Sequence, residues 1–133
     1  MEKNKDTEKK KDIEEISHYR DSLNHGVQHL KNKPISENLI KKLHEILLRT
    51  KRGNSKMPGQ FRKTQVYIGR PGASINEASF VPPPPSHIIP LVTNLENYLN
   101  KDLEKDKLVQ IALAHYQFEA IHPFLDGNGR VGR

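Results

Sequence analysis

The strongest constraint on the fold is a long apolar stretch near the end of the chain, which runs from Leu108 to Ile121. As a helix this stretch is apolar on nearly all of its faces, and such a helix belongs at the centre of a protein core. The residue that follows it is His122. We therefore expect residues 108–121 to form the central helix and to present His122 from a rigid, buried support.

Apolar residues elsewhere recur every three to four positions, which is typical of amphipathic helices. This spacing predicts a first helix over residues 13–31 and a second that begins after Ser36. A third is expected after Ser86, and both serines have the position of an N-cap. We expect the second helix to pack on the first. The apolar positions of these helices are, in chain order, Ile13, Ile16, Leu23, Val27 and Leu30; Leu39, Ile40, Leu43, Ile46 and Leu47; and Ile88, Leu91, Val92, Leu95 and Leu99.

The segment between the second and third helices has the features of one short β-hairpin. The alternation in residues 65–68 predicts a strand, residues 70–73 a turn, and residues 78–81 a return strand. The prolines from Pro82 to Pro85 then form a stiff segment, which is either a ligand for an SH3-type domain or, as we favour, the approach to the next helix. The fold class is therefore all-α, a bundle of five or six helices with one hairpin.

The composition fits one soluble domain rather than a secreted or membrane-spanning protein. The chain has 133 residues, of which 34% are hydrophobic and 29% charged, and it has no cysteine. That length suffices for a single core, and the lack of cysteine excludes thiolate metal sites. No apolar run has the length of a signal peptide or a membrane span. We expect a cytoplasmic protein in which residues 1–12 are a charged flexible tail, or an extension of the first helix, and residues 13–133 are the domain.

The formal net charge of +6 is concentrated in residues 41–56. The basic residues of this segment are Lys41, Lys42, Arg49, Lys51, Arg52 and Lys56, and Glu45 is its only acidic residue. Such a segment can attract nucleic acid, but no aromatic residues interleave with it for base stacking. We therefore interpret it as a solvated basic face and do not expect nucleic acid as a partner.

The end of the chain, from His122 to Arg133, gathers residue types suited to phosphoryl or nucleotidyl transfer. A histidine has an ordinary pKa near 6.5, so a neutral His122 can accept a proton from a hydroxyl group. Asp126 supplies a hard oxygen ligand, which suits Mg²⁺ held by one carboxylate together with phosphate oxygens and water. These two residues are a candidate general base and a candidate metal ligand.

A glycine-flanked turn follows these two residues. Gly127 and Gly129 surround Asn128, so the backbone can adopt positive φ and direct successive N–H groups at one phosphate. If a helix begins here, Arg130 and Arg133 lie on one side of its first turn and can reach the same polyphosphate. The sequence therefore predicts a phosphate cradle beside the candidate base.

This run resembles the signature of the Fic (filamentation induced by cAMP) family, His-Pro-Phe-x-Asp-Gly-Asn-Gly-Arg-x-x-Arg, at every defined position. The resemblance implies a protein adenylyltransferase, which moves AMP from ATP to a protein hydroxyl. By this resemblance His122 is the base that activates a Ser, Thr or Tyr hydroxyl of the target, and Asp126 holds Mg²⁺. The other motif residues are implied to bind ATP, with the α- and β-phosphates at Gly127, Asn128 and Gly129 and the outer phosphates at Arg130 and Arg133.

The resemblance extends from about residue 13 to the end and implies a Fic-like helical bundle that is incomplete at its C-terminus. The segments Gly59–Arg62, Thr64–Gly69 and Phe80–Pro84 resemble the approach to the flap on which Fic proteins dock the target backbone by strand addition. Many relatives also carry an inhibitory Ser/Thr-x-x-x-Glu motif, from which residues 17–21 differ in ending with Asp. We therefore expect any inhibitory helix or antitoxin to lie outside this chain.

Two other classes of function remain open on the sequence. Within enzymes, the same motif residues suit another group transfer from a phosphate donor, or the removal of AMP from a modified target. Outside enzymes, the chain is a helical module that binds a nucleotide or a nucleic acid. Incubation with α-labelled ATP separates these classes, because a binding module leaves no covalent label on protein.

Overall fold

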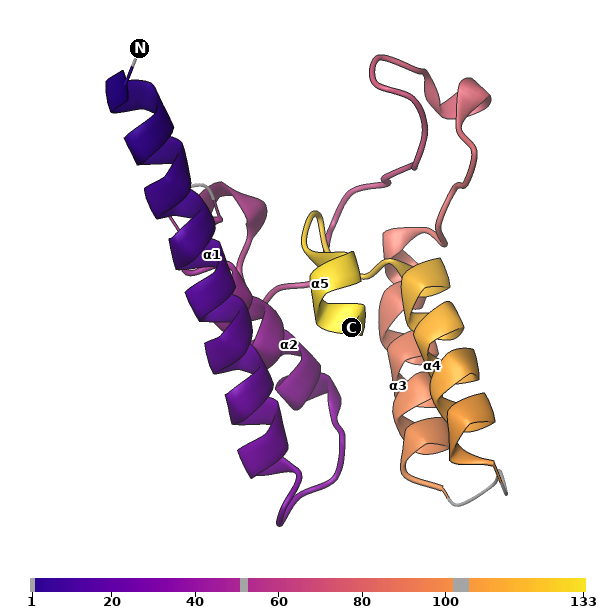
Figure 1. The fold of residues 1–133 in the computed structure, drawn as a ribbon. Coiled ribbons are helices and arrows are strands. Elements are labelled where there is room, and N and C mark those ends of the chain that lie inside the picture. The colour runs from indigo at the N-terminus through magenta and orange to yellow at the C-terminus, as the bar shows by residue number, and fades with distance from the viewer. Residues whose placement is uncertain (1, 51–52, 102–105) are drawn as a thin grey trace. The chain divides into compact units, whose positions relative to one another are not determined.

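The chain is mostly helical in a computed structural model that describes residues 2–50, 53–101 and 106–133 (Figure 1). Its α-helices are α1 (Glu2–His29), α2 (Glu37–Leu47), α3 (Ile88–Leu99), α4 (Lys107–Ile121) and α5 (Asn128–Gly132). The described residues also form three short 3-10 helices, η1 (Asn54–Lys56), η2 (Ile75–Glu77) and η3 (Pro85–His87). They contain no sheet. The all-α prediction is therefore confirmed. The chain forms two compact units, Met1–Gln60 and Phe61–Arg133.

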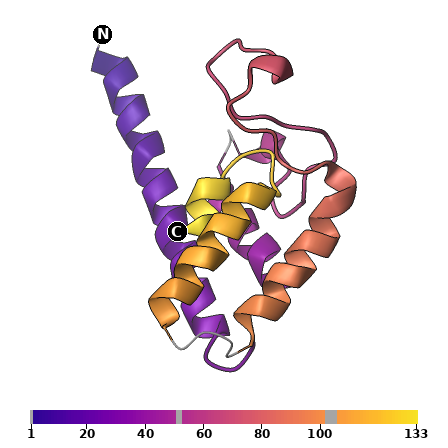
Figure 2. The same cartoon turned by 90° about the vertical axis from the view of Figure 1, so that its right-hand side faces the viewer.

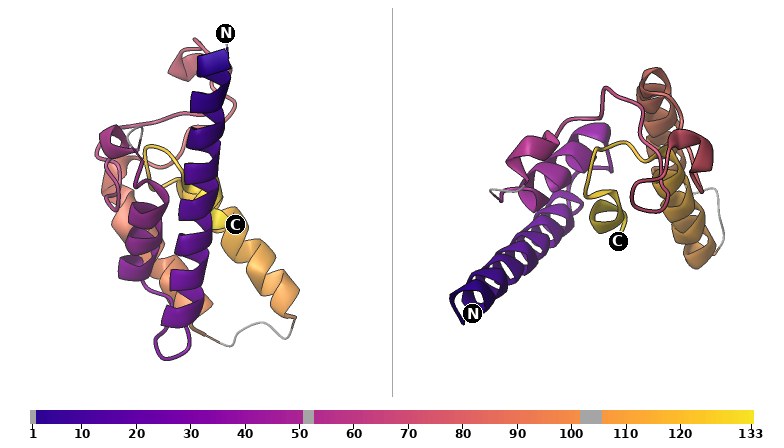
Figure 3. Two further views of the ribbon diagram at one scale, coloured as in Figure 1. Left: turned by 60° about the vertical axis from the view of Figure 1, so that its left-hand side comes forward. Right: turned by 90° about the horizontal axis from the view of Figure 1, so that it is seen from above.

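In the first unit α1 lies along α2 (Figure 3). Small and polar side chains make the contact. Among residues 8–29 of α1, the buried ones are Ser22 and Gly26, which are one helical turn apart. The Ser22 hydroxyl donates to the carbonyl of Leu43, 3.0 Å away. A Cβ atom added at Gly26 would lie 3.4 Å from the Leu43 side chain. Small residues therefore allow the two helix backbones to approach each other.

The packing of α2 on α1 was predicted from the sequence, but the apolar stripe of α1 is not the face that packs. Its members, Ile13, Ile16, Leu23, Val27 and Leu30, are 47% to 68% exposed. Apolar spacing shows which side chains line up along a helix, whereas the contact here depends on small residues that carry little hydrophobic signal. The helix also begins at Glu2, so residues 2–12 continue it.

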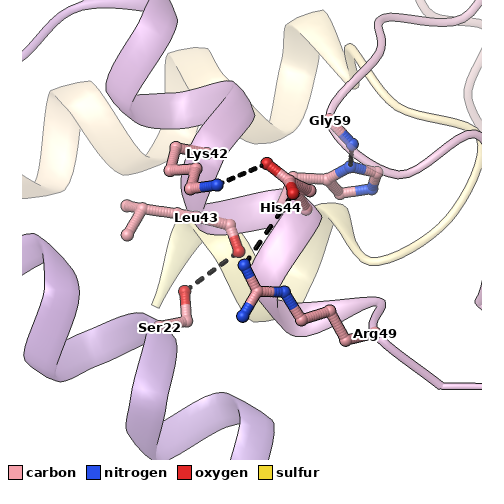
Figure 4. A network of polar contacts seen from close by, with 7 residues as sticks. Ser22, Lys42, Leu43, His44, Arg49 and Gly59 are labelled. Carbon is pink, nitrogen blue, oxygen red and sulfur yellow. Dashed lines mark hydrogen bonds and ion pairs between the residues drawn. The ribbon is translucent and has the colours of Figure 1, made fainter.

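The second helix follows its prediction closely. The Ser36 side chain accepts the N–H of Leu39, 3.2 Å away, and so caps α2 as expected. Its buried apolar residues are Leu39, Ile40, Ile46 and Leu47. His44 is fully buried on the same helix, and its Nδ1 accepts the N–H of Gly59 at 2.9 Å (Figure 4). This bond ties the segment after α2 back to the helix.

Part of the basic segment is neutralised within the first unit. Glu45 forms ion pairs with Lys42 at 2.8 Å and with Arg49 at 3.8 Å (Figure 4). Lys41 pairs with Glu37 one turn earlier. Lys51 and Arg52 lie outside the described residues. These charges are paired and partly exposed to solvent, which agrees with the interpretation of this segment as a solvated face.

In the second unit α3 and α4 lie side by side (Figure 1, Figure 2). Asp106 caps α4, because its Oδ1 accepts the N–H of Leu108 at 2.9 Å. The cap expected from Ser86 is absent, since η3 precedes α3 and the Ser86 hydroxyl instead lies 3.2 Å from Nδ1 of His87. The buried face of α3 consists of Ile88, Val92 and Leu95.

The helix α4 is less buried than its composition predicts. Leu108, Ile111 and Tyr116 are 62% to 76% exposed. Among the described residues of its unit, the helices that pack most closely on α4 are α3 and the short α5, and one face of α4 is covered. That face consists of Gln110, Ala114, Phe118 and Ile121. No described helix, α4 included, is both long enough and apolar enough to cross a membrane.

The predicted hairpin is reduced to one antiparallel bridge between Ile68 and Phe80. The N–H of Ile68 donates to the Phe80 carbonyl at 2.8 Å, and the Ile68 carbonyl accepts from Ser79 and Phe80. The residues between them turn through η2 instead of extending into paired strands. We call residues 64–81 the flap.

Candidate functional site

The end of α4 fixes the backbone at His122. Its N–H donates to the carbonyl of Phe118, 3.0 Å away, and its φ of 49° and ψ of 59° lie in the left-handed region. This conformation costs a non-glycine residue roughly 1–2 kcal/mol, so it persists only where the surroundings hold it. Phe124 anchors the turn, because it is 0% exposed and its ring lies 5.3 Å from that of Phe61.

A buried arginine that sequence reasoning did not single out also holds this turn. Arg62 is 2% exposed, and its Nε donates to the carbonyl of His122 at 2.8 Å. One terminal nitrogen donates to the carbonyls of Pro83 at 2.6 Å and Ile121 at 3.3 Å, and the other to that of Thr64 at 3.2 Å. Arginine is seldom fully buried, and no local pattern marks this one as buried.

The imidazole of His122 is held toward its neutral form. Burial of the ring is the largest influence and lowers the pKa of His122, and the positive charge of Arg62 acts in the same direction. The backbone carbonyl and carboxylate of Glu119 favour the charged ring. The carbonyl falls short of a hydrogen bond, however, since Nδ1 of His122 has no partner in the described part of the chain. A neutral imidazole can accept a proton, as a general base must.

The loop after His122 is closed by Asn128, which is 2% exposed. Its Oδ1 accepts the N–H of Phe124 and its Nδ2 donates to the Phe124 carbonyl, both at 2.9 Å. The Asn128 side chain is therefore committed to the loop and is not available to a ligand. Gly127 has a φ of 80°, which glycine adopts without steric cost, whereas Gly129 lies in α5 without positive φ.

The charged residues of the motif lie around α5. Oδ1 of Asp126 accepts the N–H of Gly127 at 2.6 Å and lies 3.8 Å from a guanidinium nitrogen of Arg130. The side chains of Asp126 and Arg130 are 49% and 29% exposed, so both are accessible to a ligand. Nε of Arg133 donates to the carbonyl of Gly129 at 3.1 Å. The structure therefore brings Asp126 and Arg130 together, while Arg133 folds back on its own helix.

The short helix α5 packs on the last turns of α4 through Gly132. A Cβ atom there would lie 2.5 Å from Oε1 of Glu119 and 3.2 Å from the Phe118 ring, whereas one at Gly129 would meet nothing closer than 3.9 Å. Nδ1 of His115 lies 2.9 Å from the Gly132 carbonyl. His115 is thus an exposed residue that holds the end of α5.

The similarity to known proteins covers most of the chain. A sequence profile of the Fic/DOC family matches residues 34–133. The chain belongs to the Fic/DOC family. The resemblance seen in the terminal motif is therefore confirmed over a much longer stretch of this Fic chain.

Named relatives and a solved structure show how far the similarity extends. A protein named as a probable protein adenylyltransferase in Aquifex aeolicus (strain VF5) is 31% identical over 134 residues, covering 97% of this chain and 38% of the relative. The protein adenylyltransferase Fic of Drosophila grimshawi is 41% identical over 78 residues, covering 56% of this chain and 14% of the relative. A crystal structure of a Fic domain containing signaling protein from Bacteroides thetaiotaomicron VPI-5482 superposes with a TM-score of 0.67 at 27% identity, covering 91% of this chain and 45% of the other. The Fic chain thus spans less than half the length of each.

Proposed function

We propose that this Fic chain transfers AMP from ATP to a Ser, Thr or Tyr hydroxyl of a target protein. The observation that carries the proposal is His122, which is fixed in a left-handed turn and biased toward its neutral form. It stands at the start of a loop that leads directly to Asp126 and α5. The names of two relatives, both protein adenylyltransferases, support the same activity.

In this reaction His122 takes the proton of the target hydroxyl while the hydroxyl oxygen attacks the α-phosphorus of ATP. The new bond joins that oxygen to the α-phosphorus, the bond from the α-phosphorus to the bridging oxygen breaks in line, and pyrophosphate leaves. His122 then releases its proton to solvent. Because burial disfavours the charged ring, this release is favourable at neutral pH.

The nucleotide would be held by the backbone and the arginines of α5. The N–H groups at the start of a helix have no partner within that helix, so those of Asn128 and Gly129 can bind phosphate oxygens. Arg130 and Arg133 add two positive charges within one turn, which suits the outer phosphates. Arg130 would exchange its pair with Asp126 for the polyphosphate.

Asp126 fits a single-carboxylate Mg²⁺ site. Its carboxylate is half exposed and lies at the start of the phosphate-binding loop. The described residues contain no group of three or more His, Cys, Asp or Glu that could hold a metal. A site of one carboxylate completed by phosphate oxygens and water therefore suits this chain. When bound, Mg²⁺ would neutralise the negative charge of the polyphosphate.

The flap would receive the target. Its residues Tyr67, Ile68, Phe80 and Val81 are 40% to 46% exposed and offer apolar contacts to an extended segment. Backbone pairing along Thr64–Gly69 would then place a target hydroxyl near His122. We propose a cytoplasmic setting, with any inhibitory helix or antitoxin supplied from outside this chain.

The proposal is tested by incubation of the protein with a cell lysate, Mg²⁺ and ATP that is labelled at either the α- or the γ-phosphate. Transfer of AMP predicts covalent label on protein from the α position only, together with release of pyrophosphate. Label from the γ position that appears only when the protein is added to the lysate would show phosphoryl transfer instead. Nucleotide binding without covalent label would show a binding module, and either result would contradict the proposal.

A further inference from the structure

The guanidinium of Arg62 is buried with its charge, and each of its side-chain hydrogen bonds described above ends on a backbone carbonyl. Burial lowers the pKa of the Arg62 side chain, but a guanidinium stays protonated in proteins. A buried charge is costly unless hydrogen bonds satisfy it. Here the partners are the carbonyls of four residues, Thr64, Pro83, Ile121 and His122. The buried charge of Arg62 therefore needs all four of these carbonyls to stay in place.

The four carbonyls belong to two places that are far apart in the sequence. Ile121 and His122 form the end of α4, where the chain turns into the left-handed conformation. Thr64 begins the flap, and Pro83 follows its end. The backbone N–H of Arg62 adds a further bond to this set, since it donates to the Pro123 carbonyl at 2.9 Å. One side chain therefore contacts the His122 turn, the first residue of the flap and Pro83, which lies just beyond the end of the flap.

We propose that Arg62 is a positioning residue, which holds the His122 turn in its left-handed conformation and fixes that turn relative to both ends of the flap. The inference rests on the proposed role of His122 as the base. In that reaction the flap presents the target and His122 receives its proton. A loss of Arg62 would therefore misplace the base against the target hydroxyl, while the nucleotide-binding residues of α5 keep their own contacts.

The planar fork of arginine is what the site requires. Its nitrogens donate in several fixed directions, whereas the ammonium of lysine is a compact point charge on a flexible stem. Arg62→Lys keeps the charge but cannot reach all four carbonyls, and Arg62→Met removes both the charge and the donors. If geometry is the function of Arg62, both variants lose turnover. If charge alone matters, the lysine variant retains it.

Gln110 offers a matched control in the same unit. It is 8% exposed, and its Nε2 donates to the carbonyls of Lys101 at 3.0 Å and Tyr98 at 3.3 Å. Like Arg62 it is a buried donor to backbone carbonyls, but its bonds tie the start of α4 to the end of α3. Gln110→Leu should therefore lower thermal stability without misplacing His122.

The experiment compares the wild-type full chain with Arg62→Lys, Arg62→Met and Gln110→Leu. We expect AMP transfer by both Arg62 variants to fall about 100-fold, the loss that a misplacement of about 1 Å can cause, with ATP affinity unchanged in calorimetry. Gln110→Leu should keep near wild-type turnover at temperatures where it is folded. Full activity of Arg62→Lys, or equal losses in the Arg62 and Gln110 variants, would overturn the proposal. If Arg62→Met does not fold, the lysine variant decides.

A second readout does not depend on catalysis. Amide hydrogen exchange at Phe124, whose N–H is bound to Asn128, should accelerate in both Arg62 variants and stay unchanged in Gln110→Leu. Unchanged exchange in the Arg62 variants would refute the positioning role. A wild-type chain that labels no protein would instead refute the proposed function, and exchange alone would then decide the role of Arg62.

Discussion

At the scale of single residues, the lowered pKa of His122 predicts how activity responds to acid. The base works in its neutral form, and burial places its pKa below the ordinary value of about 6.5. We therefore expect kcat/KM to decrease only when the pH falls below about 6.5, where His122 begins to be protonated. A pH–rate profile between about pH 4.5 and 8 measures this decrease, because that range extends to both sides of the ordinary pKa of histidine. An apparent pKa above 7 for this decrease would contradict the account.

The same shift has a consequence for folding. Because the folded pKa of His122 lies below that of the unfolded chain, the unfolded chain binds more protons as the pH falls through this range, so acid destabilises the fold. The loss should begin near pH 6.5 and continue down to the folded pKa. Urea unfolding of the wild type and of His122→Ala measures this loss. The two pH values are about 7.5 and 5.5, one on each side of the ordinary histidine pKa. An equal acid-induced loss in both proteins would assign the effect to other groups.

Asn128 predicts a second effect at this scale. Asn128→Ala removes two hydrogen bonds to the backbone of the buried residue Phe124, so the free energy of unfolding should fall by about 1–3 kcal/mol. Asn97 on α3 is exposed, and Asn97→Ala should change stability by less than about 0.5 kcal/mol. Denaturant unfolding compares the two variants. Similar stability in both would show that the loop does not depend on Asn128.

At the scale of elements, the packing of α5 on α4 predicts different outcomes at its two glycines. A Cβ atom at Gly132 would lie 2.5 Å from Oε1 of Glu119 and 3.2 Å from the Phe118 ring, whereas one at Gly129 would make only an ordinary van der Waals contact with that oxygen at 3.9 Å. Gly132→Ala should therefore be less stable than Gly129→Ala, because the Glu119 carboxylate must rotate aside and the Phe118 ring must shift slightly. Gly129→Ala should be neutral or slightly stabilising, since alanine favours a helix by about 1 kcal/mol. Thermal unfolding of both variants measures the difference, and the reverse order would contradict the observed packing.

The contact between α1 and α2 predicts that a change at a small residue of α1 destabilises more than a change at an apolar residue. The apolar spacing of the sequence alone would predict the opposite order. Gly26→Leu places a large side chain against Leu43 and should destabilise the first unit by about 1–3 kcal/mol. Leu23→Gln changes a side chain that is 54% exposed and should cost less than about 0.5 kcal/mol. Chemical unfolding monitored by helical circular dichroism distinguishes them. A larger loss of stability in Leu23→Gln than in Gly26→Leu would show that the apolar stripe of α1 is the packed face.

These elements show which parts of the structure could be predicted from the sequence. The Ser36 cap and the buried stripe of α2 depend on local spacing, and both were predicted correctly. The prediction of the packed face of α1 was wrong, because small residues rather than apolar ones make the contact. The hairpin shrank to one bridge, since short alternation does not by itself specify paired strands. Spacing cannot show how much of a helix finds a partner, so the exposure of α4 was missed.

The candidate site divides in the same way. The motif from His122 to Arg133 is contiguous, so its residues could be named from the sequence. The commitment of the Asn128 side chain to the loop and the return of Arg133 to Gly129 depend on three-dimensional geometry. Arg62 is 60 residues away from His122, and a lone arginine beside a turn carries no sign that it will be buried. Long-range polar contacts of this kind are visible only in the structure.

In the molecule as a whole, the proposed chemistry belongs to the second unit. The His122 turn, Arg62, the flap and α5 all lie within Phe61–Arg133. The family match begins earlier, at residue 34, and so includes α2 of the first unit. The central claim is that His122 acts as the base of AMP transfer, and it can be separated from nucleotide binding because the base and the cradle are different residues.

The most direct measurement compares the wild type with His122→Ala in two assays, ATP affinity by calorimetry and covalent labelling by α-labelled ATP. The account predicts that ATP affinity is retained while AMP transfer falls by roughly 10²–10⁴-fold, the usual loss of a positioned base. Gly127→Val is the matched control, because a β-branched residue is strained at a φ of 80° and should weaken ATP binding itself. Undiminished labelling by His122→Ala would contradict the account.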